Sequence, residues 1–223
     1  PLALYALVIN PLVTYVAAVH GGYQGSLWRF VGERTSDLTT AAVGPLWFVE
    51  GLLVFSILYA LARVVTRRVP ALASRASRPA GVPGNRSLAL FAVALGLVTF
   101  LVRIWTPVGW WWEPPHLEPA HFPQYAAMFV AGLAAYRGDW LGRFPVAQAR
   151  PWRWVAAAFA LLFPVIVVAA LTPEGELSPA PAGGLNPLSL AYAMWEGVMC
   201  VAMSITVLVW ARERLNHQGP LAR

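Results

Sequence analysis

The stretch from Leu88 to Trp105 reads LALFAVALGLVTFLVRIW, and it decides the fold class. It carries a single charged residue, Arg103, and it approaches the roughly 20 apolar residues that a helix needs to cross the hydrocarbon core of a bilayer. A β-strand of this length would be unusual, and the stretch is rich in Ala and Leu without the alternation of a strand. The pattern therefore predicts a transmembrane helix.

Five further segments have the same character. They are the ranges 2–19, 45–65, 122–136, 154–171 and 190–211. The segment 122–136 is the shortest of them. Six such runs, 88–105 included, predict an all-α, polytopic transmembrane bundle. Because no linker of distinct composition separates them, we expect a single membrane domain over residues 1–223.

The composition supports a membrane protein. Of 223 residues, 58% are hydrophobic and only 12% are charged, and the mean hydropathy is +0.59. Soluble domains carry about 45–50% apolar and about 25% charged residues, so an ordinary soluble enzyme and a disordered chain are excluded. The only cysteine, Cys200, rules out an intrachain disulfide and a zinc site built on several cysteines.

The arginines predict the orientation. All 16 basic residues are Arg, and thirteen of them lie in the stretches 63–86, 137–153 and 212–223. Cytoplasmic loops carry the excess of basic residues, so these stretches are assigned to the cytoplasm and the loops 20–44, 106–121 and 172–189 to the outside. The basic charge then reflects membrane topology in a multi-pass protein of the cytoplasmic (inner) membrane, and no nucleic-acid partner is needed to explain it.

Three charged residues lie inside the predicted spans: Glu50, Arg103 and Glu196. At 1.5 Å per residue they lie about 7.5, 3 and 9 Å from the outer ends of their helices, in one shallow layer. Burial of an isolated charge is costly, so we expect Arg103 to lie near Glu50 or Glu196, with Glu50 preferred because its helix precedes that of Arg103 directly. A structural ion pair and a polar lining for a substrate at the outer leaflet are both compatible with this layer.

The outer loop from Trp110 to His121 reads WWWEPPHLEPAH. Its tryptophans, with Trp105, fit an aromatic belt at the headgroup level, or a surface on which sugar rings stack. The loop also holds the residue types of a metal site, at Glu113, His116, Glu118 and His121. Its prolines exclude the regular helix that would present a histidine pair, so we expect no metal site, and acid–base use of a histidine is the stronger alternative.

Three motifs in order resemble membrane acyltransferase family 3. They are GPLWFVEGLLVFSILY at 44–59, FPQYAAMFVAGLAAYR at 122–137, and WEGVMCV at 195–201 followed by the charged tail 212–223. The last motif is similar to the subgroup of the glucan biosynthesis protein C type. Together the motifs cover most of the chain.

The resemblance implies an O-acyltransferase with no cofactor, in which an acyl-CoA donor lies on the cytoplasmic side and a carbohydrate acceptor on the outer side. The acyl group would be of the acetyl or succinyl type, and the acceptor a surface or periplasmic glycan. The Arg-rich inner loops would hold the phosphates of CoA or anchor to lipid headgroups. The residues expected to line the substrate site are Trp47, Glu50, Arg103, Gln124, Tyr125 and Glu196, with Glu113, His116 and His121 as weaker candidates in the outer loop.

The catalytic histidine of the family lies on a first span of about ten, in a motif that this sequence does not contain, and neither His116 nor His121 matches that motif. We therefore expect the chain to be an internal fragment without the general base, inactive by itself. A multi-span transporter is the competing interpretation, because buried Glu and Arg also suit a proton-coupled carrier.

The topology is testable by cysteine labelling in the full-length protein. Cysteines at Ser77 and Ser178 should react from opposite sides of the membrane, because six arginines lie in the loop of the first and none in the loop of the second. An impermeant thiol reagent added outside should label position 178 alone. Labelling of both positions from outside would contradict the orientation.

Overall fold

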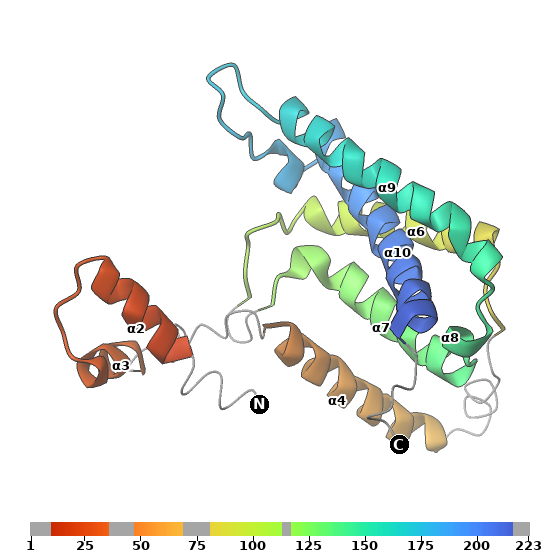
Figure 1. Ribbon diagram of the computed structural model, residues 1–223, viewed down its shortest axis with the longest axis horizontal. Helices are drawn as coiled ribbons and strands as arrows, with labels where there is room; N and C mark the ends of the chain where they lie inside the picture. The colour runs from red at the N-terminus through yellow and green to blue at the C-terminus, as the bar shows by residue number, and fades with distance from the viewer. Residues whose placement is uncertain (1–9, 36–46, 69–80, 113–116, 216–223) are drawn as a thin grey trace. The chain divides into compact units, whose positions relative to one another are not determined.

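The computed structural model describes residues 10–35, 47–68, 81–112 and 117–215, and within these ranges the chain is helical apart from two isolated β-bridges. The chain divides into two compact units: residues 1–65 with 111–117, and residues 66–110 with 118–223 (Figure 1). We call them unit 1 and unit 2. The all-helical class predicted from the sequence is confirmed for the described residues.

Unit 1 contains α2 (Asn10–His20), α3 (Leu27–Thr35) and most of α4 (Trp47–Arg67). The rings of Tyr15, Tyr23 and Phe30 pack edge-on, with centroids 5.2–6.4 Å apart, and they join α2 to α3. The Tyr15 hydroxyl also donates a hydrogen bond to the Gly25 carbonyl (3.1 Å). Trp28 on α3 is 82% exposed, as expected for a short helix lying at a membrane interface.

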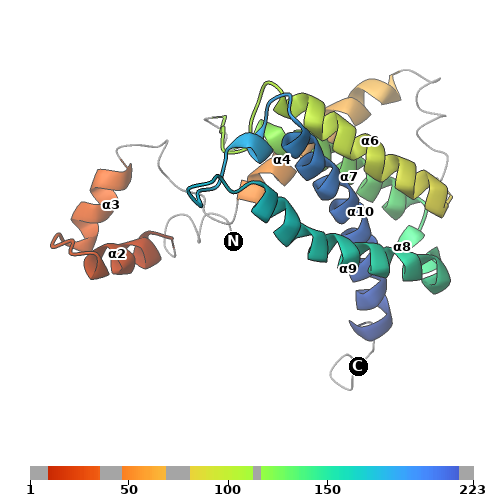
Figure 2. The same ribbon diagram turned by 90° about the horizontal axis from the view of Figure 1, so that it is seen from above.

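Unit 2 is built on three long helices: α6 (Asn85–Arg103), α9 (Val146–Ala169) and α10 (Pro187–Leu215). Figures 1 and 2 show α10 lying along both of the others. The core where they meet consists of small and aliphatic residues around one tryptophan: Ala92, Leu95, Trp152, Ala156, Val201 and Ala202. The described residues of the unit also form four shorter helices: η3 (Pro119–His121), α7 (Phe122–Arg137), α8 (Trp140–Arg143) and η4 (Ala180–Ala182).

Two glycines set the distance between α6 and α10. A Cβ atom on Gly197 would lie 2.6 Å from the Gly96 nitrogen, and one on Gly96 would lie 2.9 Å from the Met194 Cα. Neither position therefore has room for a side chain. Small residues allow transmembrane helices to approach closely, and the resulting van der Waals contact supplies the association energy that lipid does not.

The six predicted spans are only partly matched. By length and apolar composition, three of the described helices can cross a membrane, namely α6, α9 and α10. Helix α7, predicted as the span 122–136, has 16 residues, which is short for a bilayer core. Helix α2 covers the second half of the predicted span 2–19, and helix α4 covers nearly all of the predicted span 45–65. The first residues of both spans, 2–9 and 45–46, lie outside the described ranges.

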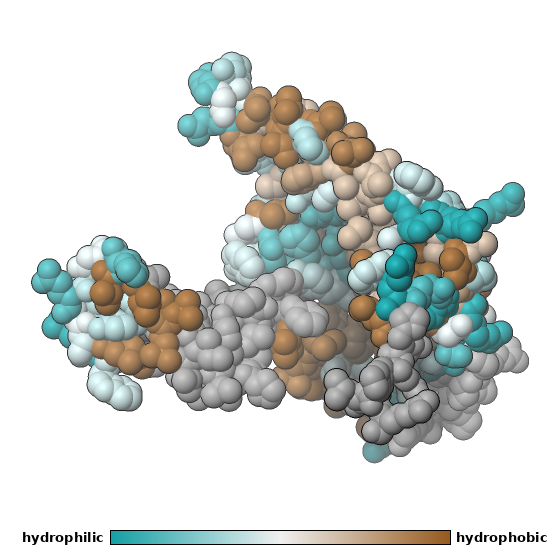
Figure 3. Space-filling model, viewed as in Figure 1, coloured by the Kyte–Doolittle hydropathy of each residue, from teal (hydrophilic) through white to brown (hydrophobic). Residues whose placement is uncertain are grey.

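The outer surfaces of the long helices are apolar. Leu90 on α6, Leu161 on α9 and Leu208 on α10 are 71%, 78% and 54% exposed. Figure 3 shows hydrophobic residues covering much of α9, and hydrophilic groups gathered where α9 begins and α10 ends. Exposed aliphatic surface of this extent is typical of helices that face lipid.

The glycine contact gives a stability prediction. Gly197→Ala should lower the free energy of unfolding by about 1–3 kcal/mol, because the added Cβ would push α6 away from α10. Gly132→Ala on α7 is the matched control, since a Cβ there meets nothing within 4 Å, and the change should be neutral or slightly stabilising. Thermal unfolding in detergent measures both variants. Equal stability of the two would show that the close approach of the helices is not needed.

Candidate functional site

The polar residues of unit 2 converge where α6 ends and α10 begins. The Arg103 side chain is fully buried in the last turn of α6, and its Nη2 lies 2.5 Å from Glu196 Oε2 on α10. The guanidinium also lies over the Tyr192 ring, 5.2 Å from the centroid. The carboxylate balances the arginine charge, and the ring supplies an electron-rich face, so this cation is stabilised in an otherwise apolar core.

The pair is close but not fully hydrogen-bonded. Within the described ranges, none of the three guanidinium nitrogens of Arg103 has a hydrogen-bond partner of good geometry, although Nη2 contacts the Glu196 carboxylate. The hydroxyls of Thr99 and Ser189, both fully buried in the same two helices, likewise lack a partner there. Buried polar groups are normally satisfied, so these donors can still form hydrogen bonds with a group that enters the region.

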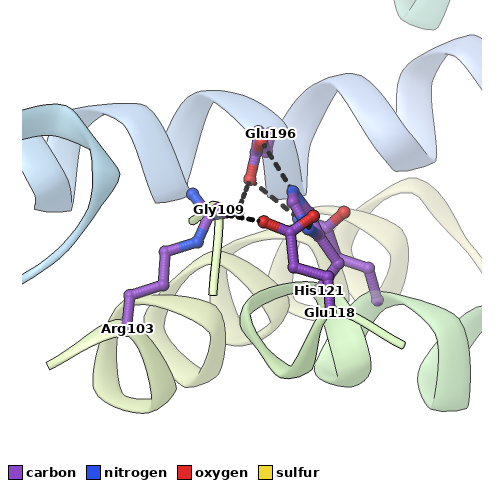
Figure 4. Close-up of polar contacts among 6 residues, drawn as sticks. Arg103, Gly109, Glu118, His121 and Glu196 are labelled. Atoms are coloured by element: carbon purple, nitrogen blue, oxygen red, sulfur yellow. Dashed lines mark hydrogen bonds and ion pairs between the residues drawn. The ribbon is translucent and has the colours of Figure 1, made fainter. Parts of the chain in front are cut away.

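Glu196 also contacts the start of α7 and the short helix η3 that precedes it. Gln124 Nε2 at the start of α7 donates to Glu196 Oε2 (3.1 Å), and His121 Nε2 lies 3.5 Å from Glu196 Oε1. The side chain of Glu196 is only 11% exposed. Three elements therefore supply polar groups to one carboxylate, and Figure 4 shows two of these groups, Arg103 and His121, beside Glu196.

His121 lies between two carboxylates. Its Nδ1 is 3.1 Å from Glu118 Oε2, on the side opposite to Glu196. Glu118 is fixed in turn, because its Oε1 accepts a hydrogen bond from the Gly109 backbone N–H (2.5 Å). The Tyr125 ring stacks on the imidazole at a centroid distance of 6.1 Å. We call Arg103, Glu118, His121, Gln124 and Glu196 the polar cluster.

The local backbone explains how the polar cluster is held in place. The Arg103 carbonyl at the end of α6 accepts a hydrogen bond from Gly184 N–H, and Val108 N–H donates to the Ala182 carbonyl. The loops after α6 and before α10 are thus joined. Asn186 closes the start of α10: its Oδ1 accepts from Ser189 N–H, and its Nδ2 donates to the Ala180 and Gly183 carbonyls.

The structure places the predicted site residues unequally. It brings Arg103, Gln124, Tyr125, His121 and Glu196 together, and of the two carboxylates predicted to lie near Arg103, Glu196 does so. Trp47 and Glu50 belong to α4, but their side chains lie outside the described residues, as do Glu113 and His116. The preference for Glu50 over Glu196 as the arginine's partner therefore stays a prediction.

Two contributors were not expected from the sequence. Tyr192 lies one turn before Glu196 on α10, so a search for aromatic residues at that spacing would find it. Glu118 was predicted only as a residue type of a metal site, whereas here its Oε2 lies 3.1 Å from His121 Nδ1 and its Oε1 accepts from the Gly109 N–H. In the described part of the chain, no group of His, Cys, Asp and Glu has the arrangement of a metal site. The polar cluster offers proton acceptors, donors and a buried cation, which suit the binding of hydroxyl groups.

Trp195, from the third sequence motif, supports the neighbouring surface of α10. Its ring stacks on Tyr192 (5.9 Å, 12° between planes) and packs on Phe163 of α9, and its Nε1 donates to the Phe159 carbonyl. The tryptophan therefore fixes the ring that faces Arg103.

The comparisons with known proteins point to one family. The model of that family, described as an acyltransferase domain, matches residues 1–221. Neither the curated proteins nor the solved structures contain a match to the chain. The motifs that carry Gln124, Tyr125 and Glu196 thus fall inside a match that extends over nearly the whole chain.

A double-mutant cycle tests the central pair. Arg103→Met should destabilise the protein by about 3 kcal/mol, because it leaves the Glu196 carboxylate buried without its cation. Glu196→Gln should also destabilise, because it leaves the arginine unbalanced. The double variant should lose less than the sum of the two. Strict additivity in thermal or urea unfolding would show that the two side chains do not interact.

Proposed function

Because this chain belongs to acyltransferase family 3, we propose that it is the membrane domain of an O-acyltransferase that modifies a surface or periplasmic glycan. The donor is an acyl-CoA that delivers an acetyl or succinyl group from the cytoplasmic side. The acceptor is a carbohydrate hydroxyl on the outer side. Residues 1–223 form one domain in a multi-pass protein of the inner membrane, with the six spans predicted from the sequence.

The polar cluster is the observation that carries the proposal. It joins the end of α6 and the start of α7 to the first half of α10, on the side that the arginine distribution assigns to the outside. Carboxylates, an amide and an imidazole are the groups that recognise sugar hydroxyls. Exposed tryptophans extend from the same loop: Trp105 is 76% and Trp110 is 50% exposed, and Trp110 follows Gly109, whose N–H binds Glu118.

The reaction needs a base, a nucleophile and an activated carbonyl. The base removes the proton of the sugar hydroxyl, the oxygen attacks the thioester carbonyl, and the tetrahedral intermediate collapses with departure of the CoA thiolate, which takes up a proton. His121 does not match the family's catalytic motif, so we assign it to the acceptor. Its imidazole, oriented by Glu118, holds the hydroxyl in position for attack, and burial beside Glu196 and Arg103 limits the water that would hydrolyse the donor.

Family membership favours this activity over the carrier interpretation. A carrier would use the same buried charges to bind a transported solute, and would need no acyl donor. The two functions separate in one assay, in which the full-length protein in nanodiscs is given radiolabelled acetyl-CoA or succinyl-CoA with glucan oligosaccharides. Label should enter the oligosaccharide only when both substrates and the protein are present.

The role of His121 is tested by kinetics of the full-length enzyme. His121→Gln should raise the KM for the acceptor about tenfold or more, because it removes a hydrogen bond within a charged cluster, while the KM for acyl-CoA stays unchanged. Glu176→Gln is the matched control, because Glu176 is exposed in another outer loop. If His121→Gln abolished kcat without changing either KM, its assignment to acceptor binding would be wrong.

A further inference from the structure

Unit 2 contains an apolar cavity that the polar cluster does not use. It has a volume of about 950 Å³, is open on one side, and is lined by residues of α6, α7, α8 and α10. Its walls are aliphatic and aromatic, as Phe91, Leu95, Val130, Ala131, Ile205 and Leu208 illustrate. Among the described residues that line it, the polar side chains are Ser87, Ser204 and the indole of Trp140, and the Ser204 hydroxyl already donates to the Cys200 carbonyl at 2.7 Å.

The cavity is elongated. Along α7 its lining runs from Pro123 to Ala135, and twelve residues of helix at 1.5 Å each span about 18 Å. One leaflet of a bilayer contributes about half of a 30 Å hydrocarbon core, or about 15 Å. The cavity is therefore about as long as one fatty-acyl chain of a lipid. Two of the helices that line it, α6 and α10, are long and apolar enough to cross a membrane.

One end of the cavity is basic. Arg86 precedes the lining residue Ser87, and Arg143 lies between Leu141 and Phe144, which both line the cavity. The start of α9 lies next to the start of α6 at this end of the cavity, because Gln148 Nε2 in the first turn of α9 donates to the Pro83 carbonyl just before α6 (2.6 Å). Both arginines are exposed, and neither forms an ion pair with another residue in the described ranges.

The remaining charges at this end do not cancel the arginines. Arg212 Nη1 donates to the carbonyls of Leu141 and Phe144, both at 2.8 Å, and its Nη2 pairs with Glu213 at 3.0 Å. Asp139 is the other acidic residue nearby, at the start of α8. The rim formed by Arg86 and Arg143 thus faces outward with a positive charge, on the side that the arginine distribution assigns to the cytoplasm.

We propose that this cavity binds an anionic phospholipid of the inner leaflet, with one fatty-acyl chain inside it and the phosphate against Arg86 and Arg143. A hydrocarbon chain fits walls that offer almost no hydrogen-bonding groups, whereas the amides of a CoA arm would lose their hydrogen bonds to water there. An arginine near the surface contributes attraction to anionic lipid that a neutral residue does not. The site goes beyond the proposed acyl transfer and does not depend on it.

Native mass spectrometry of the full-length protein in detergent tests the headgroup contact. The probes are dioleoyl phosphatidylglycerol and dioleoyl phosphatidylcholine. Arg86→Gln with Arg143→Gln should weaken binding of phosphatidylglycerol by about 25-fold, at about 1 kcal/mol for each arginine. Arg150→Gln with Arg153→Gln is the matched control, because these two exposed arginines of α9, unlike Arg86 and Arg143, have no cavity-lining residue beside them in the sequence. An equal loss in the control pair would mean general attraction to a basic surface and would overturn the proposal.

A second variant tests the chain-binding part. Ala131→Phe fills the cavity and should reduce the binding of both phospholipids, whereas Ala158→Phe on the exposed face of α9 should not. Unchanged binding in the Ala131 variant would overturn the proposal. Displacement of phosphatidylglycerol by free CoA, which has no fatty-acyl chain, would assign the arginines to CoA phosphates and would overturn it as well.

Discussion

The buried positive charge of Arg103 is the constraint on which unit 2 depends. A guanidinium with no exposed surface needs a counter-charge, and Glu196 provides it across the interface of α6 and α10. The two helices can meet at that distance because Gly96 and Gly197 leave no side chain between them. The two contacts thus act together: the glycines allow α6 and α10 to approach closely, and the ion pair fixes which face of each helix lies against the other.

The sequence predicts the helices and the charged layer well, and the connections between them poorly. Hydrophobic runs identified α6, α9 and α10, because a bilayer demands length and apolarity that few other structures share. Counting residues from the helix ends placed Arg103 and Glu196 at similar depth, and the structure pairs them. The preference for Glu50 over Glu196 rested on chain order and stays a prediction, because the Glu50 side chain lies outside the described residues. Chain order by itself does not record that α6 packs against α10, the last helix described.

The loop between α6 and α7 shows why the rest could not be predicted. Its prolines gave no periodicity, so nothing in the sequence indicated that Glu118 would reach the Gly109 N–H and hold His121 toward Glu196. Those contacts depend on a 3₁₀ turn at 119–121 and on the backbone bonds that join this loop to the one before α10. The histidine was a weak candidate by motif, and it becomes a strong one only through tertiary structure.

The two ends of unit 2 have opposite chemistry, and this suits a reaction whose substrates come from opposite sides of a membrane. Carboxylates, an imidazole and exposed tryptophans gather at one end, and exposed arginines at the other. A carrier would need a polar path between the ends. Among the described residues of unit 2, an apolar cavity and a core of Ala, Leu, Val and Trp lie between them, and the cavity offers a hydrocarbon chain better surroundings than a hydrated solute. Within unit 2, the polar groups at one end and the arginines at the other are thus kept apart by packed helices, whose α6–α10 contact the Arg103–Glu196 pair fixes.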